Sequence, residues 1–189
     1  VSNFGNGWAV YGVRVALVPL FVAEVLHADE SLAGVALSIF AVGNASVLLL
    51  SGRLADRHGR KPLILIGLVV SALGSGSLGL ATSVPWFLVI SAVAGLGAGL
   101  LNPAQSASVA DVVGARRGGP VLAGFQMAAD VGAIVGPLVA GMLADALSFQ
   151  AGFAMTGLIL LLGLAFWLAA PETHQQRPAP ESQRDTTHA

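Results

Sequence analysis

The chain has 189 residues, of which 55% are hydrophobic and 10% are charged, and its mean hydropathy is +0.79. A soluble domain carries about 25% charged residues to cover its surface, so this composition excludes an ordinary soluble fold and predicts a protein embedded in lipid. The net charge of −1 and the absence of cysteine exclude a basic field for nucleic acid, disulfides and cysteine-ligated zinc.

Six stretches are long and apolar enough to cross about 30 Å of hydrocarbon as helices, which takes about 20 residues each. In chain order they are Phe4–Leu26, Leu32–Ser51, Leu63–Ala81, Trp86–Val113, Val121–Ala146 and Phe149–Ala170. The sequence therefore predicts an all-α membrane protein with one six-helix transmembrane domain over residues 1–171. Residues 172–189 are polar and contain proline, and we expect a disordered tail there. The apolar start without an initiator Met favours either a fragment of a longer chain or a mis-started reading frame.

The basic residues outside the spans fall on one side of a six-span chain. They lie in the second-to-third connection (Gly52–Pro62), in the fourth-to-fifth connection (Gly114–Pro120) and in the tail. The opposite connections contain no Lys or Arg: His27–Ser31, Thr82–Pro85 and Asp145–Ser148. Because cytoplasmic loops carry the excess of Lys and Arg, we expect a multi-pass protein of the cell membrane with a cytoplasmic C-terminus.

The connection between the second and third spans reads Gly52-Arg53-Leu54-Ala55-Asp56-Arg57-His58-Gly59-Arg60-Lys61-Pro62. This segment resembles the signature loop of the major facilitator superfamily, G-x-L-x-D-[RK]-x-G-[RK]-[RK], which joins the second and third helices of each six-helix half. The resemblance covers nearly the whole chain up to Pro171 and implies a half bundle built as a three-plus-three inverted repeat. It also implies a gating role for a set of residues: Gly52, Asp56, Arg57, Gly59, Arg60 and Lys61. A basic loop that only anchors topology is the alternative.

Small residues recur every four positions on the fifth predicted helix, as Ala128, Gly132, Gly136, Ala140 and Ala144. Such rows let helix backbones approach closely in lipid. With Pro137 and Gly141, these glycines also resemble the Gly-Pro motif of antiporters in this family, although ordinary helix packing explains them as well. The segment Gly141–Asp145 repeats the pattern of Gly52–Asp56 three helices later, as an inverted repeat would.

Two features of the resemblance favour the C-terminal half of such a transporter. Ser91 stands four residues before Gly95, where the first half of many drug exporters has an arginine. A polar tail also follows Pro171 directly. An intact signature loop is commoner in first halves and favours the opposite assignment.

Four polar residues lie inside the predicted spans: Arg14, Asn102, Gln126 and Asp130. Counting about 1.5 Å per residue from the cytoplasmic ends puts Arg14, Asn102 and Asp130 at one depth near the midplane, where transporters of this type bind substrate. One interpretation is a polar cavity in which Asp130 carries a proton and Arg14 is its partner or an anion contact. The other is a structural Arg14–Asp130 pair that joins two helices and never touches substrate.

Together these features predict half of a secondary active transporter, an antiporter for proton-coupled efflux of small molecules or drugs by alternating access. Its expected partners are the lipid bilayer, a small-molecule substrate and a second six-helix half, in the same polypeptide or as a second copy. A stand-alone half that works as a dimer and a non-transporting receptor or scaffold are the alternatives. No enzymatic activity, cofactor or metal is expected, because no Cys, paired-His or G-x-S-x-G motif occurs in the spans.

The predicted topology can be tested by single-cysteine labelling, because the chain has no cysteine of its own. Lys61→Cys should react with a membrane-impermeant maleimide only from the cytoplasmic side, and Thr82→Cys only from the opposite side. The physical reason is that one complete span separates the two positions. Labelling of both cysteines from the same compartment in oriented vesicles would show that the threading is wrong.

Overall fold

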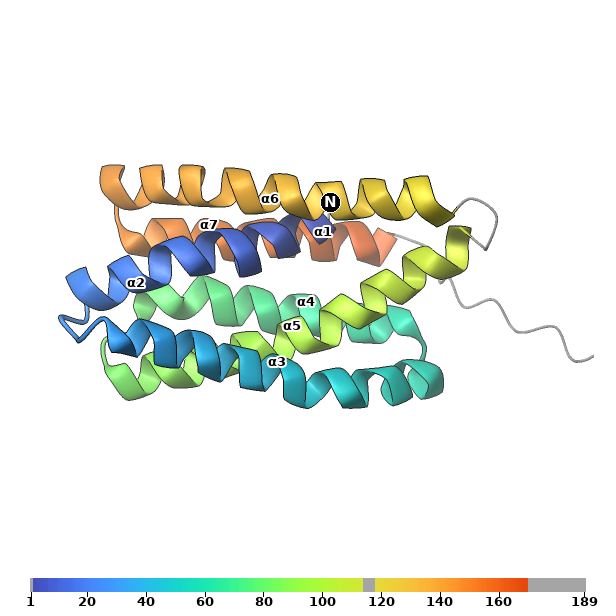
Figure 1. The fold of residues 1–189 in the computed structure, drawn as a ribbon, viewed down its shortest axis with the longest axis horizontal. Coiled ribbons are helices and arrows are strands. Elements are labelled where there is room, and N and C mark those ends of the chain that lie inside the picture. Colours follow the sequence, from blue (N-terminus) through green and yellow to red (C-terminus); the bar gives the residue numbers. More distant parts are fainter. Residues whose placement is uncertain (1, 114–117, 170–189) are drawn as a thin grey trace, which may run out of the picture.

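The computed structural model describes residues 2–113 and 118–169 of the chain (Figure 1). These residues are helical apart from short connections. The helices are α1 (Ser2–Asn6), η1 (Gly7–Val13), α2 (Arg14–Glu24), α3 (Ser31–His58), α4 (Arg60–Ser77), η2 (Leu78–Leu80), α5 (Val84–Val113), α6 (Gly118–Ala146) and α7 (Phe149–Ala169). The π-helix η1 joins α1 to α2 without a break, so these three elements form one continuous first span.

Six helical segments in the described ranges are long and apolar enough to cross a membrane. They are Ser2–Glu24, Ser31–Leu48, Arg60–Leu80, Val84–Ala110, Gly119–Ala146 and Phe149–Ala169. The predicted all-α bundle of six spans is therefore confirmed. The boundaries agree closely, and one of the largest differences is at the third span, which begins at Arg60 instead of Leu63. Hydrocarbon enforces this agreement, because a spanning segment must satisfy its backbone hydrogen bonds internally.

The connection between the second and third spans is shorter than the predicted segment Gly52–Pro62. α3 continues to His58 and α4 begins at Arg60, so Gly59 alone separates the two helices. Gly59 has φ 85° and ψ 165°, a conformation that glycine adopts without steric cost. The chain therefore reverses at Gly59, and the predicted eleven-residue connection was wrong. Leu, Ala and Arg are good helix formers, and the helix extends through them past the apolar region.

Helices α3, α5, α6 and the first span form the near side of the bundle in Figure 1, and α4 and α7 lie behind them. An aromatic cluster ties the near layer to the far one. The ring of Phe21 in α2 lies 5.5 Å from that of Phe87 in α5, centroid to centroid, and 5.8 and 5.6 Å from those of Phe149 and Phe153 in α7. Such pairs contribute about 0.5–1.5 kcal/mol beyond burial, so the cluster fixes the end of the first span.

Glycines bring the backbones of α6 and the first span into direct contact. A Cβ atom added to Gly132 would collide with the carbonyl oxygen of Phe4, and one added to Gly7 would collide with that of Ala129. A Cβ on Gly136 would lie 3.1 Å from the carbonyl oxygen of Trp8. The row of small residues on this helix is therefore a helix-packing face, as predicted.

Two of the predicted glycine contacts are not made within the described part of the chain. A Cβ on Gly52 or on Gly141 would meet no atom within 4 Å. Gly141 therefore does not share the packing role of Gly132 and Gly136, since it lies on a different side of α6. Gly52, which belongs to the signature segment, likewise has no close neighbour among the described residues of this half.

This difference predicts unequal costs for adding one methyl group to α6. Gly132→Ala should lower the free energy of unfolding by about 1–3 kcal/mol, because its Cβ overpacks a backbone contact. Gly141→Ala should leave it unchanged or raise it by up to about 1 kcal/mol, because alanine is the better helix former. Thermal unfolding in detergent measures both variants. Equal stabilities would contradict the packing described here.

Candidate functional site

Arg14 lies in the interior of the bundle, at the first α-helical position after η1, with only 3% of its surface exposed. Its Nη2 donates a hydrogen bond to the Ser75 hydroxyl in α4 (3.2 Å), and its Cζ lies 3.9 Å from the centroid of the Phe40 ring in α3. Nε is buried without a hydrogen-bond acceptor among the described residues. A charged side chain within a span costs about 2.5–3.5 kcal/mol on insertion scales. One hydroxyl and one aromatic ring offset this cost only in part, because Nε has no acceptor among the described residues.

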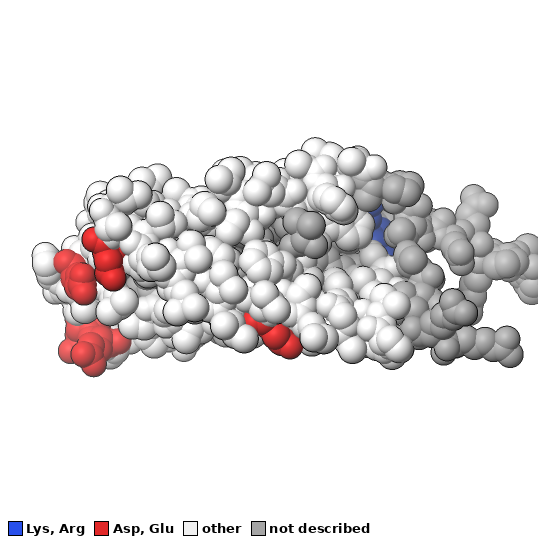
Figure 2. Space-filling view, turned by 90° about the horizontal axis from the view of Figure 1, so that it is seen from above, with Lys and Arg blue, Asp and Glu red and all other residues white. Residues whose placement is uncertain are grey.

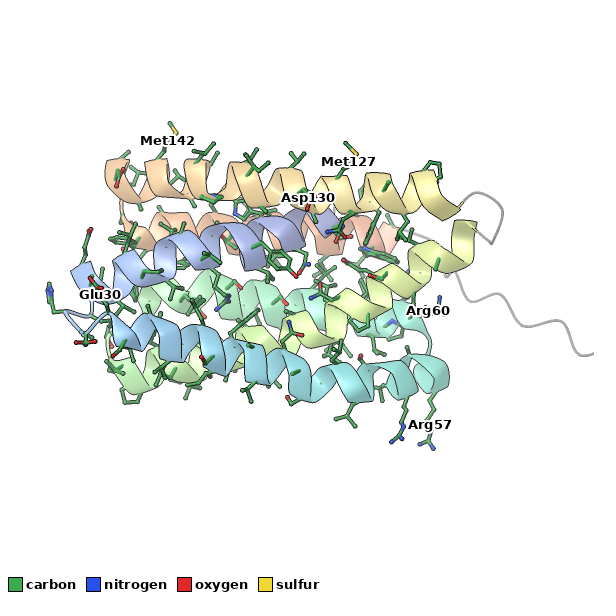
Figure 3. All side chains as sticks on the ribbon, in the orientation of Figure 1. Glu30, Arg57, Arg60, Met127, Asp130 and Met142 are labelled. Carbon is green, nitrogen blue, oxygen red and sulfur yellow. The ribbon has the colours of Figure 1, made fainter. Side chains whose placement is uncertain are left out.

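Asp130 has a different environment, because its side chain is exposed on α6. In Figure 3, Met127 and Met142 point away from the bundle, and Asp130 lies on the neighbouring flank of the helix, near the first span. Pro137 lies two helical turns further along the same side of α6 and approaches Gly12 of the first span. Asp130 therefore borders the junction between α6 and the first span.

The predicted common depth of Arg14 and Asp130 was wrong. Gly7 packs against Ala129, and Gly12 approaches Pro137 and Ala133. This register places Arg14 about two turns of α6, or roughly 10 Å, beyond Asp130 along the bundle. Arg14 contacts Ser75 and Phe40 and does not pair with Asp130. The residue count failed because it assumed that both helices begin at the same level.

A second polar cluster joins the start of the first span to α5 and α6. The side-chain amide of Asn6 donates to Oδ1 of Asn102 (2.7 Å), and that of Asn3 donates to the backbone carbonyl of Phe125. Gln105 is one turn from Asn102 and only 1% exposed, and its amide has no partner among the described residues. The structure thus assigns Asn102 to a helix-joining contact and leaves Gln126, which is exposed, one turn from Asp130.

The residues that hold Arg14 were not predicted as site residues. Ser75 and Phe40 lie among ordinary apolar and small residues, and nothing in their local sequence marks them. The serines Ser71 and Ser75, one turn apart on the buried side of α4, were the available signal. A pair of hydroxyls on one face of a span indicates a polar contact with a neighbouring helix.

The basic residues of the signature segment have two kinds of environment. Arg60 donates from Nη1 to the backbone carbonyl of Ala107 in α5 (2.6 Å), and Lys61 donates to that of Leu168 near the end of α7 (3.5 Å). Leu168 lies in the last turn of α7, where carbonyls lack intrahelical partners and attract cations, whereas Ala107 lies six residues before the end of α5. Arg57 is exposed and points away from the bundle, whereas Arg60 lies at the α4–α5 side (Figure 3). The side chain of Asp56 lies outside the part of the structure that is described.

Charge is divided between the two ends of the molecule. Figure 2 shows Asp and Glu side chains at one end, a further acidic side chain midway along this face, and Lys or Arg towards the other end. The exposed acids of the α2–α3 and α6–α7 ends are Glu24, Asp29, Glu30 and Asp145. Hydrogen bonds from the Ser31 hydroxyl and backbone N–H lower the pKa of Asp29, because they stabilise its ionised form.

The described residues contain no group of three His, Cys, Asp or Glu side chains that could hold a metal ion. The site residues that the structure holds in contact are amides, a hydroxyl and one guanidinium, and the carboxyl group of Asp130 lies apart from them. Such groups can bind polar solutes and carry protons. Polar and ionisable groups inside membrane spans mark pathways for substrates, ions or protons, and this arrangement is typical of membrane transport proteins.

Comparison with known proteins agrees with this class. The family model of the Major Facilitator Superfamily matches residues 1–188, and the chain belongs to this family. The expected membership in a family of transporters is therefore confirmed.

Relatives and solved structures match the chain over most of its length. Multidrug resistance protein MdtL of Klebsiella pneumoniae is 31% identical over 176 residues, which are 90% of this chain and 45% of MdtL. Multidrug resistance protein 1 of Bacillus subtilis is 27% identical over 189 residues, 97% of this chain and 48% of that protein. The inward-open xylose transporter XylE from E. coli has a TM-score of 0.75 at 20% identity and covers 90% of this chain and 46% of XylE. The chain thus spans about half the length of these relatives.

The Asn6–Asn102 contact can be tested by a double-mutant cycle. Interhelical hydrogen bonds in membranes contribute about 0.6 kcal/mol on average and up to about 1.7. Asn6→Ala and Asn102→Ala should each lower the free energy of unfolding, and the double variant should lose about 1 kcal/mol less than the sum. Unfolding in detergent measures the three variants. Additive losses would show that the two amides do not interact.

Proposed function

We propose that this chain is one half of a secondary active transporter that exports small molecules, including drugs, in exchange for protons by alternating access. The observation that supports the proposal most strongly is Asp130, an exposed carboxyl group near the middle of α6. An ionised carboxylate facing hydrocarbon is costly, so such residues face a bundle interior or a water-filled cavity. Here the cavity would lie between this half and a second one, with Asp130 as the proton carrier.

The exposed surface next to Asp130 would form the wall of that cavity. On the first span, Tyr11 and Val15 are 60% and 56% exposed, although most of their neighbours in the span are buried. Gln126 is exposed one turn from Asp130. A wall of this kind combines an aromatic ring, apolar area and few polar groups, which is the composition typical of small-molecule sites. Arg14 and Asn102 would support this wall from behind without touching the substrate in this state.

The second six-helix half would come from the same polypeptide or from a second copy. Relatives that are about twice as long as this chain support the first arrangement. Rocking of the two halves around the central site would provide alternating access. In the gate, Arg60 and Lys61 would hold α4 against α5 and α7 within this half, and the exposed Arg57 would contact the opposite half together with Gly52 and Asp56.

Export and antiport rest on two further observations. The relatives named above are multidrug resistance proteins by name, and a third relative is called a multi-drug resistance efflux pump, PmrA of Streptococcus pneumoniae. The glycines of the antiporter-like motif, Gly132 and Gly136, pack the first span tightly against the helix that carries Asp130. We place the protein in the cell membrane with its basic side in the cytoplasm.

Asp130→Asn in the complete transporter should abolish transport driven by an imposed pH gradient, because an amide cannot release and rebind the proton. Flux should fall to the level of vesicles without protein, at unchanged expression. Asp145→Asn is the matched control, since Asp145 is an exposed acid at the end of the same helix and should retain full flux. Proton-driven flux in Asp130→Asn equal to that of the unmodified transporter would remove Asp130 from the mechanism.

A further inference from the structure

The first span contains a wide turn immediately before its buried cation. Residues Gly7–Val13 form a π-helix, and the backbone N–H of Arg14 bonds to the carbonyl of Ala9, five residues back. A π-turn holds one residue more than an α-turn, is intrinsically rare and is frequent at functional sites. Neither of its flanks is irregular, since α1 and α2 continue it as ordinary helices. The extra residue is therefore stored within an otherwise continuous span.

Glycine contacts hold the π-turn against α6. Gly7 lies so close to α6 that a Cβ would collide with the Ala129 carbonyl, and a Cβ on Gly12 would lie 3.0 Å from Cδ of Pro137. The π-turn is wider than an α-turn, and it fits against α6 because Gly7 and Gly12, near its two ends, have no side chains. The π conformation thus depends on its packing against α6, because the π-helix itself is less favourable than the α-helix.

Arg14 is incompletely satisfied in the position that the π-turn gives it. It has one neutral hydroxyl partner, Ser75, and one aromatic contact, Phe40, while Nε is buried without an acceptor. A buried donor without a partner costs about 1–3 kcal/mol. The guanidinium group would therefore be at least as stable in a position where water or an anion could bind it as in its position opposite Ser75 and Phe40.

Conversion of the π-turn to regular α-helix would bring Arg14 to a position of this kind. Each residue of a π-turn rotates the chain about the helix axis by a smaller angle than a residue of an α-helix does. If the π-turn becomes α-helical, the residues that follow it therefore rotate about the axis by about 100°, the angle of one α-helical residue. Each residue then takes the direction of its successor. Arg14 would take the direction of Val15, which is 56% exposed, and Val13 would replace it opposite Ser75 and Phe40.

The same span has a second position that can accommodate a π-turn. Pro19 lies inside α2 and has no backbone N–H, so one hydrogen bond of the preceding turn is already missing. If the π-turn shifted from Gly7–Val13 to the turn that precedes Pro19, only the residues between these two positions would rotate about the helix axis. Phe21 and Val22, which are fully buried, would keep their contacts.

We propose that Arg14 is a mobile anion-binding residue, stored in the bundle by the π-turn and delivered to the exposed face of the first span by a one-residue register shift. There it binds an anionic group such as a carboxylate, sulfate or phosphate oxyanion. The inference rests on the proposed function in one respect, namely that the exposed face lines a water-filled cavity. It adds to that function a binding residue of opposite charge to Asp130 and about two helical turns away from it.

The experiment measures the reactivity of Arg14 in the complete transporter in lipid vesicles. p-Hydroxyphenylglyoxal, a water-soluble reagent for guanidinium groups, is added, and modification of each arginine is followed by mass spectrometry. We expect Arg14 to react more slowly than the exposed Arg57 but faster than the protein unfolds. Inorganic sulfate should slow the reaction of Arg14 relative to that of Arg57.

Gly12→Ala tests the link to the π-turn. Its Cβ overpacks the contact with α6 and should raise the rate at Arg14 about tenfold. Gly34→Ala is the matched control, because a Cβ there meets nothing within 4 Å, and it should leave the rate unchanged. An equal rate at Arg14 in both variants would overturn the proposed role of the π-turn.

The exchange variant R14V/V15R separates this inference from the proposed function. It keeps the composition of the span and fixes a guanidinium on the exposed face, so it should react as fast as Arg57. Rapid reaction of R14V/V15R together with no reaction of Arg14 beyond the unfolding rate would overturn the mobile arginine and leave the cavity intact. No reaction in R14V/V15R would show that the face is dry and would overturn the cavity itself.

Discussion

The contact between the backbones of α6 and the first span is the constraint on which the other features depend. Lipid removes the hydrophobic force between helices, so association relies on close packing. Gly7 and Gly132 provide it by leaving no side chain between the two backbones. This contact sets the register of the helices, and the register in turn separates Arg14 from Asp130. It also gives the π-turn the room that a wider helix needs.

The two ionisable groups within the spans occupy opposite environments for a common physical reason. Arg14 has a long side chain that reaches between helices to Ser75 and Phe40, and there a π-system and a hydroxyl partly replace water. Asp130 has a short side chain on the flank of α6 and reaches no such partner within the described residues. A short acid on an outer flank needs water or a proton. A long cation can be buried, although at a cost that favours any state in which it is hydrated.

The sequence was sufficient for features that depend on one helix at a time. Hydropathy located the six spans, and the spacing of Gly132 and Gly136 identified a packing face, because both patterns lie within a single segment. It was not sufficient for features that depend on two helices. Equal residue counts placed Arg14 and Asp130 together, but the packing of Gly7 on Ala129 offsets the helices. Gly141 failed for a related reason, since a glycine is a contact only if a neighbour faces it.

The signature segment combines two tasks that a sequence motif does not distinguish. Arg60 and Lys61 donate to backbone carbonyls of α5 and α7, so removing them would loosen the packing of α4 against these two helices. Arg57 is exposed at the end of α3, and no such stabilisation of its own half is expected from it. A gate between two halves needs residues of the second kind, because a contact that breaks and reforms in each cycle cannot also hold the bundle together. In the proposed gate, Arg60 and Lys61 would therefore support the packing of this half, and Arg57, on the other side of the reversal at Gly59, would make the switching contact.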